Sequence, residues 1–140
     1  MAWVAVVIII ALLVFFSFGL AVARARGRYN CPAPATTGNE MFERYYRVQM
    51  NTLEQLVLFI PAILLFAWIF DPHWAAGLGV VWIAGRLVYF RSYVRNPRSR
   101  AIGFAMTALP SLGMLLACLV ALVIQLARAG DGLLSQTMLG

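Results

Sequence analysis

The chain has 140 residues, of which 63% are hydrophobic and 11% are charged. This composition is typical of a membrane protein with one domain and excludes an ordinary soluble domain. The net charge is +6 and every basic residue is Arg, but the arginines cluster beside apolar segments instead of following one polar face, which disfavours nucleic-acid binding.

Four apolar segments follow one another along the chain, at about residues 3–22, 44–70, 74–94 and 100–127. Each is long enough to cross about 30 Å of hydrocarbon as a helix. The segments have no alternating strand pattern, and lipid admits only helices and closed barrels. We therefore expect one domain over residues 1–140, an all-α four-helix membrane bundle.

The first apolar segment has the features of a retained anchor and not of a signal peptide. No basic residue precedes it, and three arginines follow it directly. The connector that follows, residues 24–41, carries Pro32, Pro34 and Gly38. We expect a loop over this connector.

The other two connections are short. Asp71-Pro72-His73 predicts a tight turn between the second and third segments, and residues 95–100 join the third to the fourth. Pro61 and Pro110 fall inside apolar segments, which membrane helices tolerate when neighbours satisfy the freed backbone groups.

The placement of arginine predicts the topology. All arginines except Arg128 fall toward the first and third connections, which two antiparallel hairpins put on one side. The positive-inside rule then predicts a multi-pass protein whose arginine-rich loops are cytosolic and whose termini both lie on the opposite side. The compact, lysine-free sequence favours a bacterial inner membrane.

One face of the second segment carries three polar residues. Arg47, Asn51 and Glu54 are spaced i, i+4, i+7, which places them on one side of a helix. A carboxylate within a membrane span costs several kcal/mol unless it is paired or solvated, so it marks a functional site by default. A cation, an amide and an anion together suit a small zwitterionic ligand.

The third segment presents a matching face. Arg86, Tyr89 and Tyr93 are spaced i, i+3, i+7. Counted from the turn between the two segments, Glu54 lies about 24 Å along its helix and Tyr89 about 22 Å along the next. Arg100 opens the fourth segment on the same side. We therefore expect these side chains to converge near the cytosolic interface.

Simpler interpretations remain open for some of these residues. Tyr89 and Tyr93 could be ordinary aromatic-belt residues. Glu54 could form a structural ion pair with Arg47 or with Arg86. The number of polar groups at one depth exceeds what one ion pair requires, and this favours a ligand site.

The sequence predicts neither a disulfide nor a metal site. Cys31 lies in a polar connector and Cys118 lies deep in the last apolar segment, so the two thiols should be far apart. The chain has one histidine, His73, and no paired cysteines at the spacing of a zinc site.

Two ordered motifs closely resemble one known family. Residues 36–38 (TTG) and 42–54 (FERYYRVQMNTLE) form the first, and residues 86–93 (RLVYFRSY) followed by Arg100 form the second. Both resemble the membrane-associated proteins of eicosanoid and glutathione metabolism (MAPEG), in particular the microsomal glutathione transferases and the leukotriene-conjugating synthase. The resemblance implies a four-helix membrane bundle assembled as a homotrimer, with glutathione bound between adjacent subunits and open to the cytosolic side.

The same resemblance implies roles for residues of the first motif and the preceding connector. Arg47 would hold a glutathione carboxylate, and Asn51 with Glu54 would bind the γ-glutamyl end. Arg26 and Gln49 would contact the glycyl end. Glutathione carries two carboxylates and one ammonium, to which several arginines and one glutamate are complementary.

For the second motif, the resemblance implies that Tyr89 and Tyr93 line the pocket and that Arg100, supplied by the neighbouring subunit, faces the sulfur. An arginine there would stabilise the thiolate, which then attacks a lipophilic electrophile or a lipid hydroperoxide arriving from the membrane. Arg98 is the alternative thiolate partner, and spacing favours Arg100.

The chain departs from the family pattern at two positions. Gln55 stands where the leukotriene-conjugating and related transferases have Tyr, and Gly27 stands where some members have a second arginine beside Arg26. The physiological electrophile, and the balance between conjugation and peroxidase activity, therefore cannot be copied from any eukaryotic member.

Two other functions compete with an integral membrane glutathione transferase that serves detoxification. One is a non-enzymatic lipid-binding scaffold of the same family, which the joint presence of Arg47, Glu54 and Arg100 disfavours. The other is a small proton-coupled multidrug exporter, which uses an unpaired intramembrane carboxylate. The arginines at the depth of Glu54 should repel cationic drugs.

Overall fold

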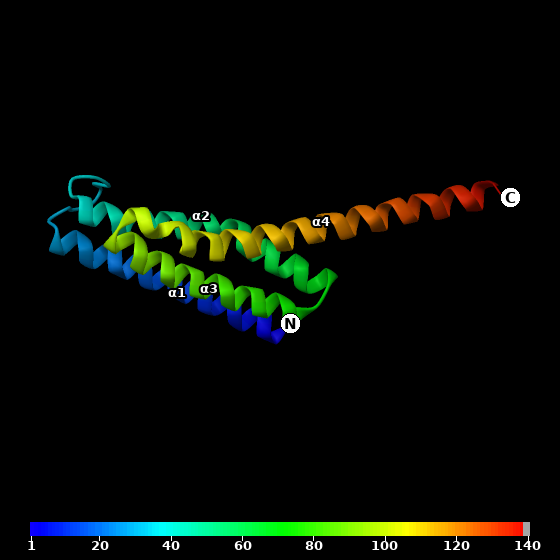
Figure 1. The fold of residues 1–140 in the computed structure, drawn as a ribbon, viewed down its shortest axis with the longest axis horizontal. Helices are drawn as coiled ribbons and strands as arrows, with labels where there is room; N and C mark the ends of the chain where they lie inside the picture. The colour runs from blue at the N-terminus through cyan, green and yellow to red at the C-terminus, as the bar shows by residue number, and fades with distance from the viewer. Residues whose placement is uncertain (139–140) are drawn as a thin grey trace.

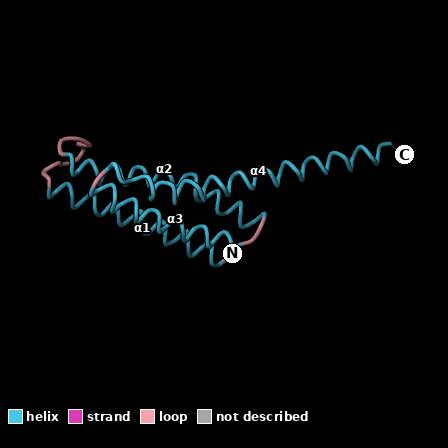
Figure 2. The backbone as a smooth tube through the Cα atoms, in the orientation of Figure 1, coloured by secondary structure: helices cyan, strands magenta, loops and turns pink. Residues whose placement is uncertain are grey.

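The computed structural model describes the backbone of residues 1–138 and the side chains up to residue 129. Its helices are α1 (Ala2–Arg28), α2 (Glu40–Ile69), α3 (Pro72–Arg95) and α4 (Ala101–Met138), with a short 3₁₀ turn, η1 (Pro97–Arg100), before α4. The described residues contain no strand. Figures 1 and 2 show α1, α2 and α3 beside the first part of α4, whose second part extends past the bundle. The predicted all-α bundle is confirmed.

Among the described residues, three helical stretches are long and apolar enough to cross a membrane: Ala2–Arg28, Glu40–Ile69 and Pro97–Ala129. The helix α3 does not reach the same apolarity, although the sequence predicts a span there. Its glycines and the buried Arg86 lower its hydropathy. Because α3 packs against α1, α2 and α4, its Arg86 is enclosed by the other helices.

The connector between α1 and α2 is shorter than the predicted loop over residues 24–41. The helix α1 continues to Arg28, because Ala and Arg are strong helix formers and arginines in the last turn favour the negative end of the helix dipole. The helix α2 already begins at Glu40, where the Asn39 side chain accepts hydrogen bonds from two backbone N–H groups of the first turn.

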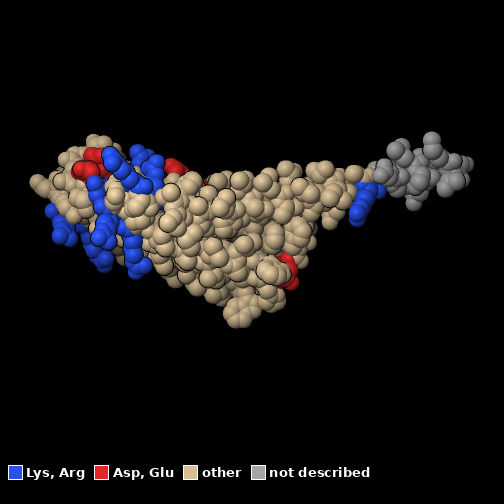
Figure 3. Space-filling view, in the orientation of Figure 1, with Lys and Arg blue, Asp and Glu red and all other residues tan. Residues whose placement is uncertain are grey.

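Most arginines gather at one end of the bundle, over the α1–α2 connector and the α3–α4 junction, and Arg128 lies apart on the extended part of α4 (Figure 3). The N-terminus and the α2–α3 turn lie at the opposite end (Figure 1). This arrangement brings the first and third connections together, as the antiparallel hairpins predicted. The side of the membrane that each end faces stays a prediction.

Two glycines allow α3 and α4 to approach closely. A Cβ on Gly85 would lie 2.7 Å from the Cβ of Met106, and a Cβ on Gly103 would lie 2.5 Å from the backbone nitrogen of Tyr89. Small residues at such crossings bring helix backbones together in membrane proteins. The close crossing fixes the position of Tyr89 relative to the start of α4.

The turn between α2 and α3 makes the stability of the fold sensitive to acid. The backbone N–H groups of Trp74 and His73 donate to the Asp71 carboxylate, and these hydrogen bonds lower the pKa of Asp71 below its ordinary value of 3.8. A depressed pKa in the folded state gives stability that is present above the unfolded pKa and is lost as pH falls through the folded pKa. We expect the melting temperature in detergent to fall below about pH 4, and Asp71→Asn, which keeps a side-chain acceptor, to remove part of this acid dependence. An unchanged acid profile in Asp71→Asn would contradict this expectation.

Candidate functional site

An open hollow of about 670 Å³ lies where α2, α3 and the start of α4 meet. It contains six of the eight residues that the sequence assigns to the site, and Arg98 besides. Its lining consists of Arg47, Asn51, Glu54, Tyr89, Tyr93, Arg98, Arg100, Ala101 and Phe104. Residues separated by up to 57 positions in the chain thus border one space. Arg98 and Arg100 both line it, so the choice between them as thiolate partner stays a prediction.

Arg44 ties α2 to the end of α3. Its Nη1 donates to the backbone carbonyls of the last two residues of α3, at 3.1 and 3.3 Å. Its Nη2 forms an ion pair with Glu40, one turn earlier on α2. These hydrogen bonds satisfy backbone carbonyl groups in the last turn of α3, which have no partner within the helix. They tie the beginning of α2 to that end, which places Arg47 across from Tyr93.

A chain of hydrogen bonds connects α4 to the acid of the site. The buried Arg86 donates through Nη2 to Oγ1 of Thr107 at 2.8 Å and through Nη1 to Oδ1 of Asn51 at 3.0 Å. The amide nitrogen of Asn51 then donates to Oε2 of Glu54 at 3.2 Å. Within the described residues Glu54 forms no ion pair. The direct pair of Glu54 with Arg47 or Arg86 that the sequence left open is therefore not formed. Asn51 bridges Glu54 and Arg86 instead.

The two tyrosines of α3 stack on each other, with ring centroids 5.4 Å apart. Tyr89 is buried inside the bundle and packs under the guanidinium of Arg86, 4.4 Å from its ring centroid. The guanidinium carbon of Arg100 lies 5.9 Å from the ring centroid of Tyr93. An aromatic-belt role requires a ring at the lipid interface. Tyr89, being buried between helices, does not fit that alternative.

Arg26 and Gln49 do not border the hollow of their own chain. Arg26 holds the α1–α2 connector: its Nη1 donates to the carbonyl oxygens of Cys31 and Ala35, at 3.2 and 2.7 Å. Gln49 faces α1, where its side-chain nitrogen would lie 3.0 Å from a Cβ on Gly19. Within a single chain, Arg26 and Gln49 therefore lie on the α1 side of α2, away from the hollow in which they were predicted to contact the ligand.

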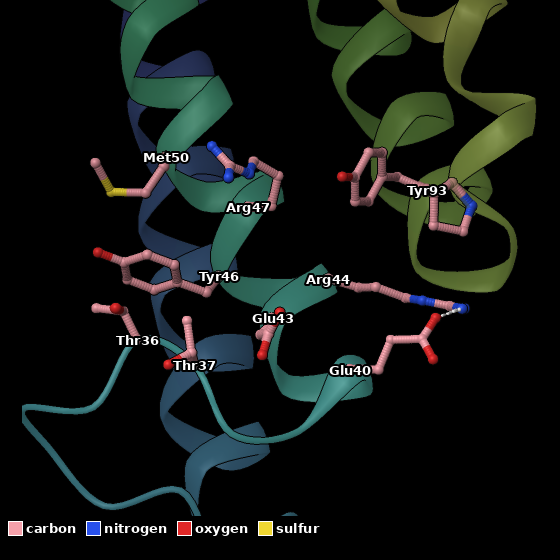
Figure 4. A pocket seen from close by; sticks show the side chains of 10 residues that line it. Thr36, Thr37, Glu40, Glu43, Arg44, Tyr46, Arg47, Met50 and Tyr93 are labelled. Carbon is pink, nitrogen blue, oxygen red and sulfur yellow. Dashed lines mark hydrogen bonds and ion pairs between the residues drawn. The ribbon is translucent and has the colours of Figure 1, made fainter.

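A second hollow, of about 340 Å³, lies closer to the connector (Figure 4). Arg47 from α2 and Tyr93 from α3 face each other across it in Figure 4, and both also border the larger hollow. Glu43, which lines it too, accepts a hydrogen bond from the backbone N–H of Gly38 at 3.0 Å. Gly38 has a φ of +127°, a conformation that favours glycine. The TTG motif therefore forms one wall of a cavity that adjoins the site.

An apolar groove of about 320 Å³ runs between α2 and α4, and Phe104 borders both this groove and the large hollow. Its lining includes Leu58, Leu109, Leu112 and Gln55. The side-chain oxygen of Gln55 is buried and accepts no hydrogen bond from the described residues. The sequence did not predict this groove, since its lining alternates between two helices that are distant in the chain.

The titratable groups of the described residues do not form a metal site. No group of three His, Cys, Asp or Glu side chains lies together in that part of the chain. Cys31 and Cys118 are both buried and unbonded.

Comparison with known proteins adds an independent observation. The chain matches the MAPEG family over residues 2–120. It is 42% identical over 128 residues to an uncharacterised protein of Synechocystis sp., a match that covers 91% of this chain and 93% of that protein. It is also 38% identical over 88 residues to human microsomal glutathione S-transferase 2 (63% of this chain, 57% of that protein) and 46% identical over 68 residues to bovine leukotriene C4 synthase (48% and 45%).

Proposed function

Because the chain belongs to the MAPEG family, we propose that it is an integral membrane glutathione transferase that binds glutathione in the large hollow between α2, α3 and α4. The observation that carries this proposal is the convergence of a carboxylate, an amide, two tyrosines and three arginines on one open space of about 670 Å³. The names of two relatives, a glutathione S-transferase and leukotriene C4 synthase, support the same chemistry.

The charges of the hollow complement those of glutathione. Arg47 supplies a guanidinium for one carboxylate, since arginine binds carboxylates through paired, charge-assisted hydrogen bonds. Glu54, held by Asn51, supplies the anion for the single ammonium. Tyr89 and Tyr93 supply an aromatic wall. Arg47 and Glu54, seven residues apart on one face of α2, would bind opposite charges of the same peptide.

The catalytic step is the attack of the glutathione thiolate on an apolar electrophile. A free thiol with a pKa of about 8.5 is only a few per cent ionised at pH 7. A guanidinium from Arg100 beside the sulfur stabilises the thiolate. The sulfur lone pair forms a C–S bond while the leaving group departs with its bonding pair. With a hydroperoxide, the sulfur attacks the terminal oxygen, the O–O bond breaks, and an alcohol is released while glutathione becomes a sulfenic acid. The thiol of a second glutathione then attacks that sulfur, which forms the disulfide and releases water.

The placement of charges supports sites between subunits of an oligomer, which the family resemblance implies is a homotrimer. Arg47 and Glu54 are exposed on the surface of the single chain, and charges that face lipid at this depth cost several kcal/mol. A neighbouring copy that covers the hollow removes this cost. The α1 side of that copy could bring Arg26 and Gln49 to the glycyl end, from which their own chain keeps them apart.

The apolar co-substrate reaches the thiolate from the membrane. The groove between α2 and α4 meets the large hollow at Phe104, so an electrophile dissolved in lipid can approach without crossing water. The protein then acts as a detoxifying enzyme of a bacterial inner membrane, with the arginine-rich end of the bundle in the cytosol and both termini on the other side.

Calorimetric titration of the purified protein in detergent tests the proposal. We expect glutathione to bind at micromolar to millimolar concentration and the protein to conjugate it to 1-chloro-2,4-dinitrobenzene. Glu54→Gln, which keeps the size but removes the charge of the side chain, should weaken glutathione binding about tenfold. A wild-type protein that neither binds nor turns over glutathione would overturn the proposal.

The same preparation separates the two competing functions. A lipid scaffold would bind a fatty acid in the α2–α4 groove without any glutathione turnover. A proton-coupled exporter would move a cationic dye in proteoliposomes and lose this transport in Glu54→Gln. Glu54 has no ion pair within the described chain, as an exporter requires, but three arginines share its hollow and disfavour a cationic cargo.

A further inference from the structure

The buried arginine of α3 has no carboxylate partner in the described part of the chain. Arg86 is fully buried, and its hydrogen bonds go to the neutral side chains of Asn51 and Thr107. An arginine removed from water without a counter-ion is expensive, because it loses its hydration and gains no opposite charge in return. A charged residue inside a membrane bundle therefore indicates that its charge or its geometry serves another group.

The geometry of these contacts fixes one orientation of the Asn51 amide. Its oxygen accepts from Arg86 and its nitrogen therefore faces Glu54, to which it donates. An arginine has no acceptor, so it admits only the oxygen of the amide on its side. Thr107 holds the other terminal nitrogen of the guanidinium. The guanidinium is thus held between a hydroxyl on α4 and an amide on α2.

The consequence for Glu54 is specific. The Asn51 amide donates to Oε2, so the carboxylate is turned with Oε1 available to a ligand in the hollow. Without Arg86 the Asn51 oxygen would lose the donor that holds it, and the Asn51 side chain could adopt other rotamers in which its nitrogen no longer reaches Glu54. The orientation of the acid that faces the hollow therefore depends on a residue that does not line it.

We propose that Arg86 is a positioning residue, which through Asn51 orients Glu54 to bind the ammonium group of an amino-acid-like ligand. This inference rests on the proposed function and deepens it. It assigns selectivity for the free α-amino group of the γ-glutamyl end to four residues joined by hydrogen bonds: Thr107, Arg86, Asn51 and Glu54. Arg86 and Thr107 themselves do not touch the ligand.

A pair of thiol substrates tests this assignment. One is glutathione, and the other is its analogue with hydrogen in place of the γ-glutamyl amino group (glutaryl-cysteinylglycine). We expect the wild-type protein to have a KM for glutathione about tenfold lower than for the analogue. Arg86→Met, which keeps an unbranched apolar side chain without donors, should raise the KM for glutathione about tenfold and the KM for the analogue by less than about twofold. A merely structural role would raise both KM values by the same factor.

Variants at Thr107 keep the test decisive if Arg86→Met does not fold. Thr107→Val keeps the shape of the side chain and removes the acceptor for Arg86, and we expect it to lower the preference for glutathione about threefold. Thr107→Ser restores a hydroxyl and should recover the preference. Equal changes for both thiols in Thr107→Val would overturn the inference. So would a wild-type protein that uses both thiols equally well, whereas a wild-type protein without glutathione activity would overturn the proposed function as well.

Discussion

Arg100→Ala is expected to lower kcat/KM for glutathione conjugation about 100-fold at pH 7, whereas Arg98→Ala should change it less than about threefold. If a guanidinium lowers the thiol pKa by about two units, its removal alone reduces the thiolate fraction about 25-fold at pH 7. Loss of a preorganised group beside developing charge typically adds to such an effect. Rates of both variants with 1-chloro-2,4-dinitrobenzene measure the difference.

The pH profile distinguishes thiolate stabilisation from general damage to the site. The wild-type rate should level off above about pH 6.5, and the Arg100→Ala rate should keep rising to about pH 8.5, where free thiols ionise. Calorimetry should show that the variant still binds glutathione. If Arg98→Ala shows the loss and the shifted profile instead, the two arginines exchange roles. If neither variant does, a guanidinium does not activate the thiol.

Gly103→Ala is expected to destabilise the bundle by at least about 1–3 kcal/mol, the usual cost of overpacking. The added Cβ would lie 2.5 Å from the nitrogen and 2.6 Å from the Cα of Tyr89. These are backbone atoms, so the contact is relieved only when α3 moves away from α4. The melting temperature in detergent should fall by more than about 3 °C, and glutathione turnover should fall with it because Tyr89 moves.

Gly113→Ala is the matched control on the same helix. No described heavy atom outside the local backbone lies within 4 Å of a Cβ at this position. Alanine is also favoured over glycine inside a helix, so the melting temperature should stay constant or rise. Equal losses in both variants would show that α4 tolerates no added methyl group, and the close α3–α4 crossing would then not be the cause.

The polar face of α2 could be predicted from residue spacing, because all of its residues lie on one helix. Arg47, Asn51 and Glu54 share a side of any α-helix that contains them, and a count of helical rise places Tyr89 at the same depth. The four helices were predictable in the same way, since long apolar runs in lipid form helices, although α3 does not reach the apolarity of the other three. The end of α1 was not, because the predicted loop was placed by its prolines while Ala and Arg extend the helix to Arg28.

The contacts across helices required the structure. Thr107 is one hydroxyl in an apolar segment, and nothing in its sequence neighbourhood indicates that it accepts a hydrogen bond from Arg86. The sequence likewise placed Glu54 near Arg86 without showing that the Asn51 amide separates them. Rotation of a helix about its axis by one residue changes such partners completely, and apolar segments constrain that rotation weakly.

The low apolarity of α3 has a consequence for biogenesis. An arginine near the centre of an isolated helix disfavours its release from the translocon into lipid by about 3 kcal/mol, and Arg86 acquires its acceptors only from α2 and α4. Entry as a helical hairpin with α2 supplies the first of these acceptors at the moment of insertion. The order in which the ribosome delivers the helices thus matters for this chain, since α3, the least apolar helix, emerges directly after α2, which supplies an acceptor for Arg86.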